Sequence, residues 1–132
     1  MQIMTNDRIY FLLKDPHWAF IWWQVDWPAA AHHALRGEFL SRPRCAAVRV
    51  HDVTDIIFDG ENSHSYVELT ESIDRTDHWY FQIPSAGRNY CAEVGIKGAQ
   101  RWFPIARSNT LFVPRDGPSA SRAQIWSTIE IA

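Results

Sequence analysis

The densest feature of the sequence is a cluster of tryptophans, four of the seven, between Trp18 and Trp27. The segment is rich in aromatic and β-branched residues, which favours a strand over a helix. Side chains of a strand point alternately to its two faces. One face is then uniformly apolar, formed by Ala19, Ile21, Trp23 and Val25. The other carries the aromatic stripe of Trp18, Phe20 and Trp22 and turns polar at Gln24.

The apolar face predicts a place in the core, so the function depends on what covers the stripe. Exposed aromatic patches of this size are uncommon on monomers. We therefore expect a helix predicted at 28–40, or the C-terminal tail, to cover the stripe. The alternatives are a second copy of the chain, another protein or a sugar ring, because aromatic side chains anchor all of these well.

Short apolar or alternating runs recur at roughly ten-residue spacing with turn residues between them, which is typical of an antiparallel sandwich. One helix is expected, opened by Pro28 and ended near Gly37. The segment 110–113 either extends the last strand or forms another. The predicted strands cover residues 9–13, 18–25, 46–51, 56–58, 66–69, 79–83, 90–96 and 102–106.

The segment from Ile83 to Tyr90 resembles the strand-to-strand corner of immunoglobulin-like and fibronectin type III domains. In that corner a tyrosine hydroxyl bonds to the backbone a few residues upstream, and Tyr90 would be that tyrosine. We therefore expect an all-β, immunoglobulin/fibronectin III-like antiparallel β-sandwich over residues 1–113, with one short helix inserted between its second and third strands. Residues 114–132 are expected to be a linker and an apolar tail containing Trp126, which docks on this domain or on a second copy.

Composition excludes several function classes. The chain is 46% hydrophobic and 14% aromatic, which is typical of a folded domain. Its 15 acidic and 13 basic residues give a net charge of -2, so neither nucleic acid nor an anionic membrane surface is an expected partner. No apolar stretch is long enough to span a membrane, and no signal peptide is visible. With Cys45 and Cys91 expected as free thiols, we expect a cytoplasmic protein.

An oxygen-rich segment offers a candidate calcium site, but its spacing does not fit an EF-hand, and its residues are ordinary turn formers. We expect turns here and no metal. The cluster comprises Asp52, Asp55, Asp59, Glu61, Asn62 and His64.

No strong catalytic motif is present. His64 with Asp59 is the one pair considered for acid–base chemistry, without a nucleophile elbow or phosphate loop to support it. Arg107 suits a carboxylate ligand, but we favour an internal pair with Glu93 across a hairpin. Nothing near Cys91 predicts a reactive thiol. We expect no catalytic residue and no cofactor.

Several segments together resemble the bacterial family known as domain of unknown function 4912. They cover most of residues 11–118 in order, and they lie at 15–23, 48–54, 58–64, 79–80, 87–95, 105–109 and 113–115. One departure is Gln24, where the family usually has Glu after the aromatic residue, so no role of that carboxylate carries over. Similar domains sit beside other modules, including α-glucan-processing ones, so the resemblance implies an accessory or carbohydrate-associated role.

The leading prediction is a non-enzymatic binding or adaptor domain that presents an aromatic surface to a protein partner, with a second copy of itself in a dimer as one candidate. The alternative is an α-glucan-binding accessory module, with Trp18 and Trp22 stacking on sugar rings and Gln24 and Arg49 bonding hydroxyls. A second alternative is a small metal-dependent hydrolase using the 59–64 loop. The predicted contact residues are Trp18, Phe20, Trp22, Gln24, Arg49 and Trp126.

Overall fold

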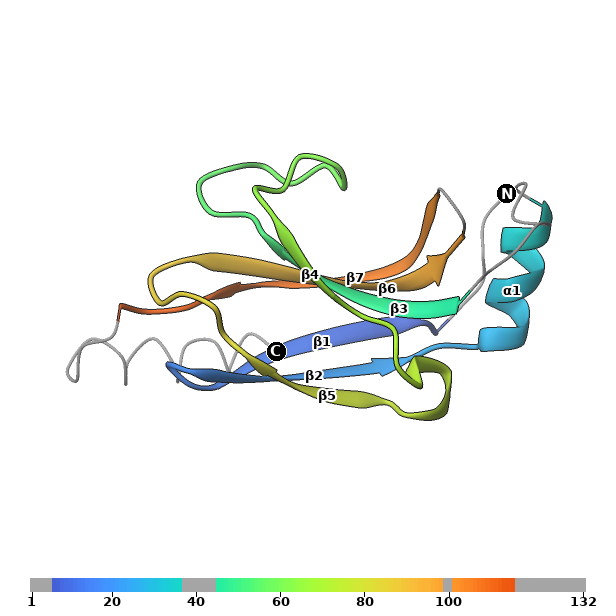
Figure 1. Cartoon of the computed structure of the whole chain (residues 1–132), viewed down its shortest axis with the longest axis horizontal. Coiled ribbons are helices and arrows are strands. Elements are labelled where there is room, and N and C mark those ends of the chain that lie inside the picture. The colour runs from blue at the N-terminus through green and yellow to red at the C-terminus, as the bar shows by residue number, and fades with distance from the viewer. Residues whose placement is uncertain (1–5, 37–44, 99–100, 116–132) are drawn as a thin grey trace.

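The computed structural model describes residues 6–36, 45–98 and 101–115 and is mostly β, with two facing antiparallel sheets (Figure 1). The three-stranded sheet has the order β1-β2-β5, and the four-stranded sheet has the order β4-β3-β6-β7. The strands are β1 (Arg8–Asp15), β2 (Trp18–Gln24), β3 (Cys45–Asp52), β4 (Tyr66–Leu69), β5 (His78–Gln82), β6 (Asn89–Lys97) and β7 (Trp102–Phe112).

The core lies between the sheets and takes the inward face of each strand. In β2 this face is Ala19, Ile21 and Trp23, as the alternation predicts. The indole of Trp23 donates from Nε1 to the carbonyl of Ile73, 3.3 Å away, so its one polar atom is satisfied. Ile73 begins the 3₁₀ turn η1 (Ile73–Arg75), which precedes β5.

The helix α1 (Trp27–Arg36) joins β2 to β3, where the sequence predicts it. Asp26 caps it, because its Oδ1 accepts from the Ala29 N–H at 3.2 Å. Ala30 of α1 packs against Ile96, so the helix lies at one end of the sandwich (Figure 1). In the described part of the chain, no helix has the length and apolar character needed to cross a membrane.

Tyr90 forms the predicted corner contact. Its hydroxyl donates to the Ser85 carbonyl at 3.1 Å and accepts from the Ser85 N–H at 3.2 Å. This pair of bonds holds the turn between β5 and β6.

One strand prediction is wrong, and one open alternative is decided. The strand expected at 56–58 is wrong, because these residues lie in the 53–65 loop between β3 and β4 and Ile57 is 93% exposed. Phe58 instead anchors the loop on the ring of His51, 4.7 Å between centroids. The segment 110–113 extends the last strand, as one of the two alternatives predicted, since β7 runs to Phe112 through two irregularities in its pairing with β6.

Candidate functional site

The outer surface of the three-stranded sheet carries aromatic side chains in register. One row across the strands is Tyr10, Trp22 and His78, and the next is Leu12, Phe20 and Tyr80. Trp18 follows, paired with Asp15 on one side and Gln82 on the other. We call this surface the aromatic face, formed by Tyr10, Leu12, Trp18, Phe20, Trp22, His78 and Tyr80.

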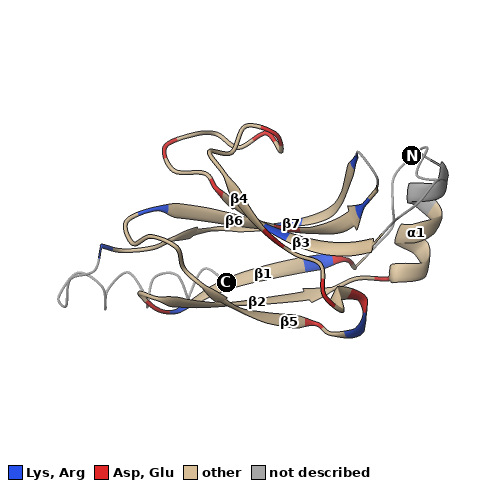
Figure 2. Cartoon of the chain, in the orientation of Figure 1, with Lys and Arg blue, Asp and Glu red and all other residues tan. Residues whose placement is uncertain are grey.

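Neighbouring rings of the aromatic face touch one another. Tyr10 stacks on Trp22 with 4.7 Å between centroids, and Phe20 lies 5.1 Å from Tyr80. The central strand β2 carries no Lys, Arg, Asp or Glu along its whole length (Figure 2). Charge lies at the ends, where Arg8 bonds the Tyr10 hydroxyl and Lys14 sits 5.6 Å from the Tyr80 ring centroid. An apolar centre with a polar edge is the usual layout of a contact surface.

The helix does not cover this face, so that expectation is wrong. Trp18 and Trp22 are 40% and 41% exposed, and Tyr80 is 54% exposed. The reason is that the apolar side chains of α1 pack against Ile96 of the four-stranded sheet. Trp126 and the tail lie outside the described residues, so their part of the prediction stays a prediction.

The predicted contact residues do not form one site. Trp18, Phe20, Trp22 and Gln24 share the outer side of β2, with Gln24 at its end beside Arg8. Arg49 lies on β3, in the other sheet. A single sugar site using both Trp18 and Arg49 is therefore excluded by the fold.

Arg49 belongs instead to a row of alternating charges across the four-stranded sheet. Glu68, Arg49, Glu93 and Arg107 are cross-strand neighbours on β4, β3, β6 and β7. We call this row the charge ladder. Arg49 Nε donates to Glu68 Oε2 at 2.7 Å, and Lys97 donates to Glu68 Oε1 at 2.6 Å. The predicted pair is confirmed, since Arg107 donates from Nε and Nη2 to Glu93 Oε2 at 3.1 and 3.0 Å.

Glu93 is the most buried charged group of the ladder, at 1% exposure. Its Oε1 accepts from His51 Nε2 at 3.0 Å and from Trp102 Nε1 at 3.1 Å. Burial by itself raises the pKa of this carboxyl, but hydrogen bonds from His51, Arg107 and Trp102 outweigh burial and hold the pKa below its usual value. Glu93 is therefore ionised at neutral pH, as a fully bonded buried carboxylate.

Above the ladder lies a pocket of about 490 Å³ between the 53–65 loop and the start of β7. We call it the polar pocket. Its floor includes Arg49, His51, Glu93 and Arg107, and its rim includes Asp59 and Glu61. The Arg49 guanidinium lies over the rings of both Tyr66 and Trp102, at 4.4 and 4.3 Å from their centroids. These two ring contacts fix the orientation of the Arg49 guanidinium in the floor of the pocket.

Ser63, His51 and Glu93 form a hydrogen-bonded chain in this pocket, in the order of a hydrolase triad. Ser63 Oγ lies 3.0 Å from His51 Nδ1, and because a carboxylate only accepts, His51 Nε2 carries the proton shared with Glu93. However, the Arg107 guanidinium already compensates the negative charge of Glu93. In a hydrolase triad this charge would instead stabilise the positively charged form of the histidine ring. We assign the chain to fixing the 53–65 loop on the sheet.

The oxygen-rich cluster forms turns. Asp59 Oδ1 accepts from the Glu61 N–H at 2.8 Å, and His64 Nε2 bonds the Thr54 carbonyl at 2.8 Å rather than Asp59. Asp52 pairs with Arg88 at 2.9 Å. Within residues 6–36, 45–98 and 101–115, no group of three or more His, Cys, Asp or Glu side chains is placed to hold a metal ion. The acid–base pair considered for a hydrolase is thus not formed.

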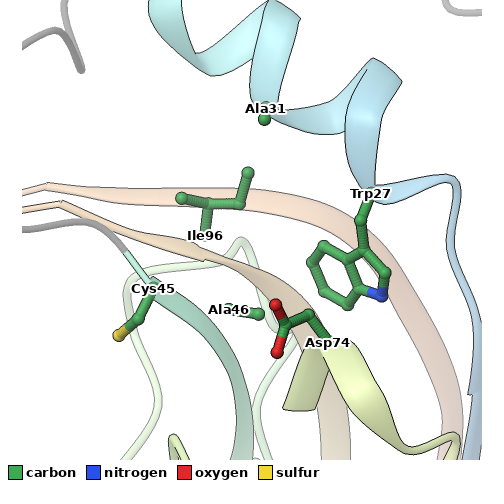
Figure 3. A pocket seen from close by; sticks show the side chains of 6 residues that line it. All are labelled: Trp27, Ala31, Cys45, Ala46, Asp74 and Ile96. Carbon is green, nitrogen blue, oxygen red and sulfur yellow. The ribbon is translucent and has the colours of Figure 1, made fainter. Parts of the chain in front are cut away.

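A second pocket, of about 210 Å³, lies where α1 meets the sheets (Figure 3). Trp27 and Asp74 both line this pocket, while the Cys45 sulfur points away from Trp27 (Figure 3). Cys45 and Cys91 are both free thiols. Burial raises the pKa of the Cys91 thiol, which keeps it protonated and unreactive.

Fold and surfaces define a small, two-sheet β domain with an open aromatic face on one sheet and a polar pocket on the other. The chain belongs to the family described as Domain of unknown function (DUF4912), whose model matches residues 5–124. No curated protein matches the chain. No solved structure matches it.

Proposed function

We propose that this chain is a non-enzymatic binding domain whose aromatic face contacts a protein partner, and that this partner is a second copy of the chain. The observation that carries the proposal is the exposure of Trp18, Trp22 and Tyr80 on the outer surface of one sheet. Exposed aromatic patches of this kind mark interaction sites, and twofold dimers are the commonest assemblies of soluble proteins.

The layout of the face supports a protein contact. Large aromatic side chains supply most of the binding energy of interfaces and lie near the centre, within a polar rim. Here Phe20 and Trp22 are central, and Arg8, Lys14 and Gln82 are at the ends. The same patch on two copies is complementary to itself in apolar character.

The test compares two tyrosines of similar exposure on opposite faces of the molecule. Tyr80 is 54% exposed on the aromatic face, and Tyr66 is 50% exposed on the other sheet. In a dilution series followed by sedimentation, Tyr80→Ala should weaken self-association about tenfold or more, as expected for an interface residue. Tyr66→Ala should leave it unchanged. Equal effects of the two variants contradict the proposal.

A carbohydrate-binding role is the second candidate, favoured by one observation. Trp18 stands beside Gln82 on the neighbouring strand, which places a ring for stacking next to an amide that can bond hydroxyls. If α-glucans bind here, intrinsic tryptophan fluorescence should change on titration, and Trp18→Ala should abolish the change. No response in the native chain removes this candidate.

We also infer an immunoglobulin-like or fibronectin III-like sandwich as the finer fold. Two observations support this inference. The chain leaves the three-stranded sheet after β2 and returns to it at β5, and Tyr90 bonds the backbone of Ser85 in the manner of a tyrosine corner.

A further inference from the structure

Arg49 is a partly buried cation whose guanidinium has hydrogen-bonding groups left over. Its side chain is 15% exposed, and its Nε donates to Glu68. Its remaining contacts in the described part of the chain are the two aromatic rings. Nη1 and Nη2 therefore have no protein acceptor among the described residues, although such buried donors are usually satisfied.

The two carboxylates of the charge ladder that neighbour Arg49 are already satisfied. The Glu93 carboxylate takes bonds from His51, Trp102 and Arg107, and Glu68 takes bonds from Arg49 and Lys97. With Lys97 beside it, the charge ladder holds three cations against the carboxylates of Glu68 and Glu93, and Arg101 also lines the pocket. One positive charge is in excess, and the free guanidinium edge of Arg49 suits a carboxylate in bidentate geometry.

The rim of the polar pocket carries negative charge. Asp59 and Glu61 line the same pocket from the 53–65 loop, and both are exposed. The Asp59 carboxylate is engaged through Oδ1 by the Glu61 N–H, while the Glu61 carboxylate has no partner among the described residues. These acids repel a dianion such as a phosphate monoester and attract an ammonium group.

The loop that bears the rim is fixed on the floor, so the two charge regions keep their relative positions. Phe58 lies under Arg107, 4.6 Å from ring centroid to guanidinium carbon, and Ser63 bonds His51. A Cβ at Gly60 would come within 3.0 Å of Arg107 Nη2, so the glycine lets the loop approach closely. A pocket of about 490 Å³ is within the range that holds small ligands.

We propose that the polar pocket binds a small zwitterion of the amino-acid class, with its carboxylate on the free edge of Arg49 and its ammonium group toward Asp59 and Glu61. This site is independent of the aromatic face. It lies on the other sheet, and its occupancy needs no second copy of the chain.

The experiment uses the whole chain and the common L-amino acids as probes, each at millimolar concentration in a thermal-shift screen. At least one should raise the melting temperature by mass action. Calorimetry then compares the best probe with its amide, which lacks the carboxylate, and with its N-acetyl derivative, which lacks the ammonium group. Each derivative should bind about tenfold or more weakly, in line with the loss of a charge-assisted bond.

Three variants separate binding from folding. Arg49→Lys keeps the charge beside Glu68 but lacks the flat fork, and should weaken binding about tenfold. Glu61→Gln should weaken it several-fold without changing the melting temperature of the free protein, because Glu61 is exposed and its carboxylate is unpartnered among the described residues. The matched control is Glu71→Gln, an exposed acid outside the pocket, which should change nothing.

The proposal is overturned if no amino acid binds, or if the amide or the N-acetyl derivative binds as well as the parent. It is equally overturned if glucose, a neutral polyol, binds in place of the amino acids. An unchanged affinity in both Arg49→Lys and Glu61→Gln would move the ligand elsewhere and overturn the assignment to this pocket.

Discussion

The side chain of Asn109 pairs with the backbone of Phe11 as if it were another strand residue. Phe11 N–H donates to Asn109 Oδ1 at 3.2 Å, and Asn109 Nδ2 donates to the Phe11 carbonyl at 3.0 Å. Phe11 lies on β1, an edge of the three-stranded sheet, and Asn109 lies on β7, an edge of the other. The Asn109 amide thus joins the two sheets, and it satisfies the backbone N–H and carbonyl of Phe11 on an edge strand that is otherwise open to pairing.

Asn109→Ala should lower the free energy of unfolding by about 2–4 kcal/mol, because both Phe11 groups lose their partner beside a fully buried side chain. Asn62 is the control. It also makes two backbone bonds, to Asp59 and Ile57, but in an exposed turn. Asn62→Ala should cost less than about 1 kcal/mol in urea unfolding. If both variants lose a similar free energy of unfolding, the bonds between Asn109 and Phe11 stabilise the fold no more than those of an exposed turn, which contradicts the prediction.

The tyrosine corner predicts a difference between two hydroxyls. Tyr90→Phe removes both bonds to Ser85 and should cost about 1–2 kcal/mol, because the Ser85 backbone groups lose a partner. Tyr80→Phe removes a hydroxyl from an exposed ring and should be nearly neutral. Chemical denaturation of both variants measures the difference, and a neutral Tyr90→Phe would contradict the corner.

The lowered pKa of the buried Glu93 carboxyl predicts that acid destabilises the fold. Its pKa is lowered in the folded chain by His51, Arg107 and Trp102 despite burial, so its ionised form stabilises the fold above the unfolded-state pKa, near 4.5. That stabilisation is lost as the pH falls through the folded-state pKa. Glu93→Gln should be less stable at pH 7 by about 1.5–3 kcal/mol, since the half-exposed Arg107 loses the charge-assisted bonds that Glu93 accepts. Its stability should also fall less steeply below pH 4.5 than that of the native chain. Parallel pH profiles would show that Glu93 is not the group responsible.

Gly95 occupies a position that has no room for a side chain. A Cβ there would lie 2.3 Å from the Phe103 carbonyl oxygen and 3.0 Å from Pro104 Cα, where β6 and β7 come close at a register irregularity. Backbone atoms cannot move aside cheaply, so Gly95→Ala should lose most of its cooperative unfolding transition, as seen by circular dichroism. A native-like transition would contradict the close approach.

Local patterns predicted the strand faces well and distant pairings poorly. The alternation in β2 correctly separated Trp23 from Trp22, and the Glu93–Arg107 pair followed because a hairpin sets its register over few residues. The Arg49–Glu93 neighbourhood requires a register between strands that are far apart in sequence. The available signal was Glu93 itself, a charge within an otherwise apolar strand, which requires buried partners.

The 56–58 prediction failed for a related reason. Three apolar residues in a row match a short strand, but Phe58 packs on His51 and Arg107 while Ile57 points to solvent. No strand in the described part of the chain pairs with the segment. Periodicity cannot tell a loop anchor from a strand when the run is this short. The helix prediction was right in place, but its packing against Ile96 depends on a partner far along the chain.

The central claim is that the aromatic face holds two copies together. Light scattering on the native chain at rising concentration measures this most directly, with a single-chain mass of 15.3 kDa. The account predicts a molar mass that rises to twice that value. A molar mass that stays at 15.3 kDa up to the highest soluble concentration would contradict it.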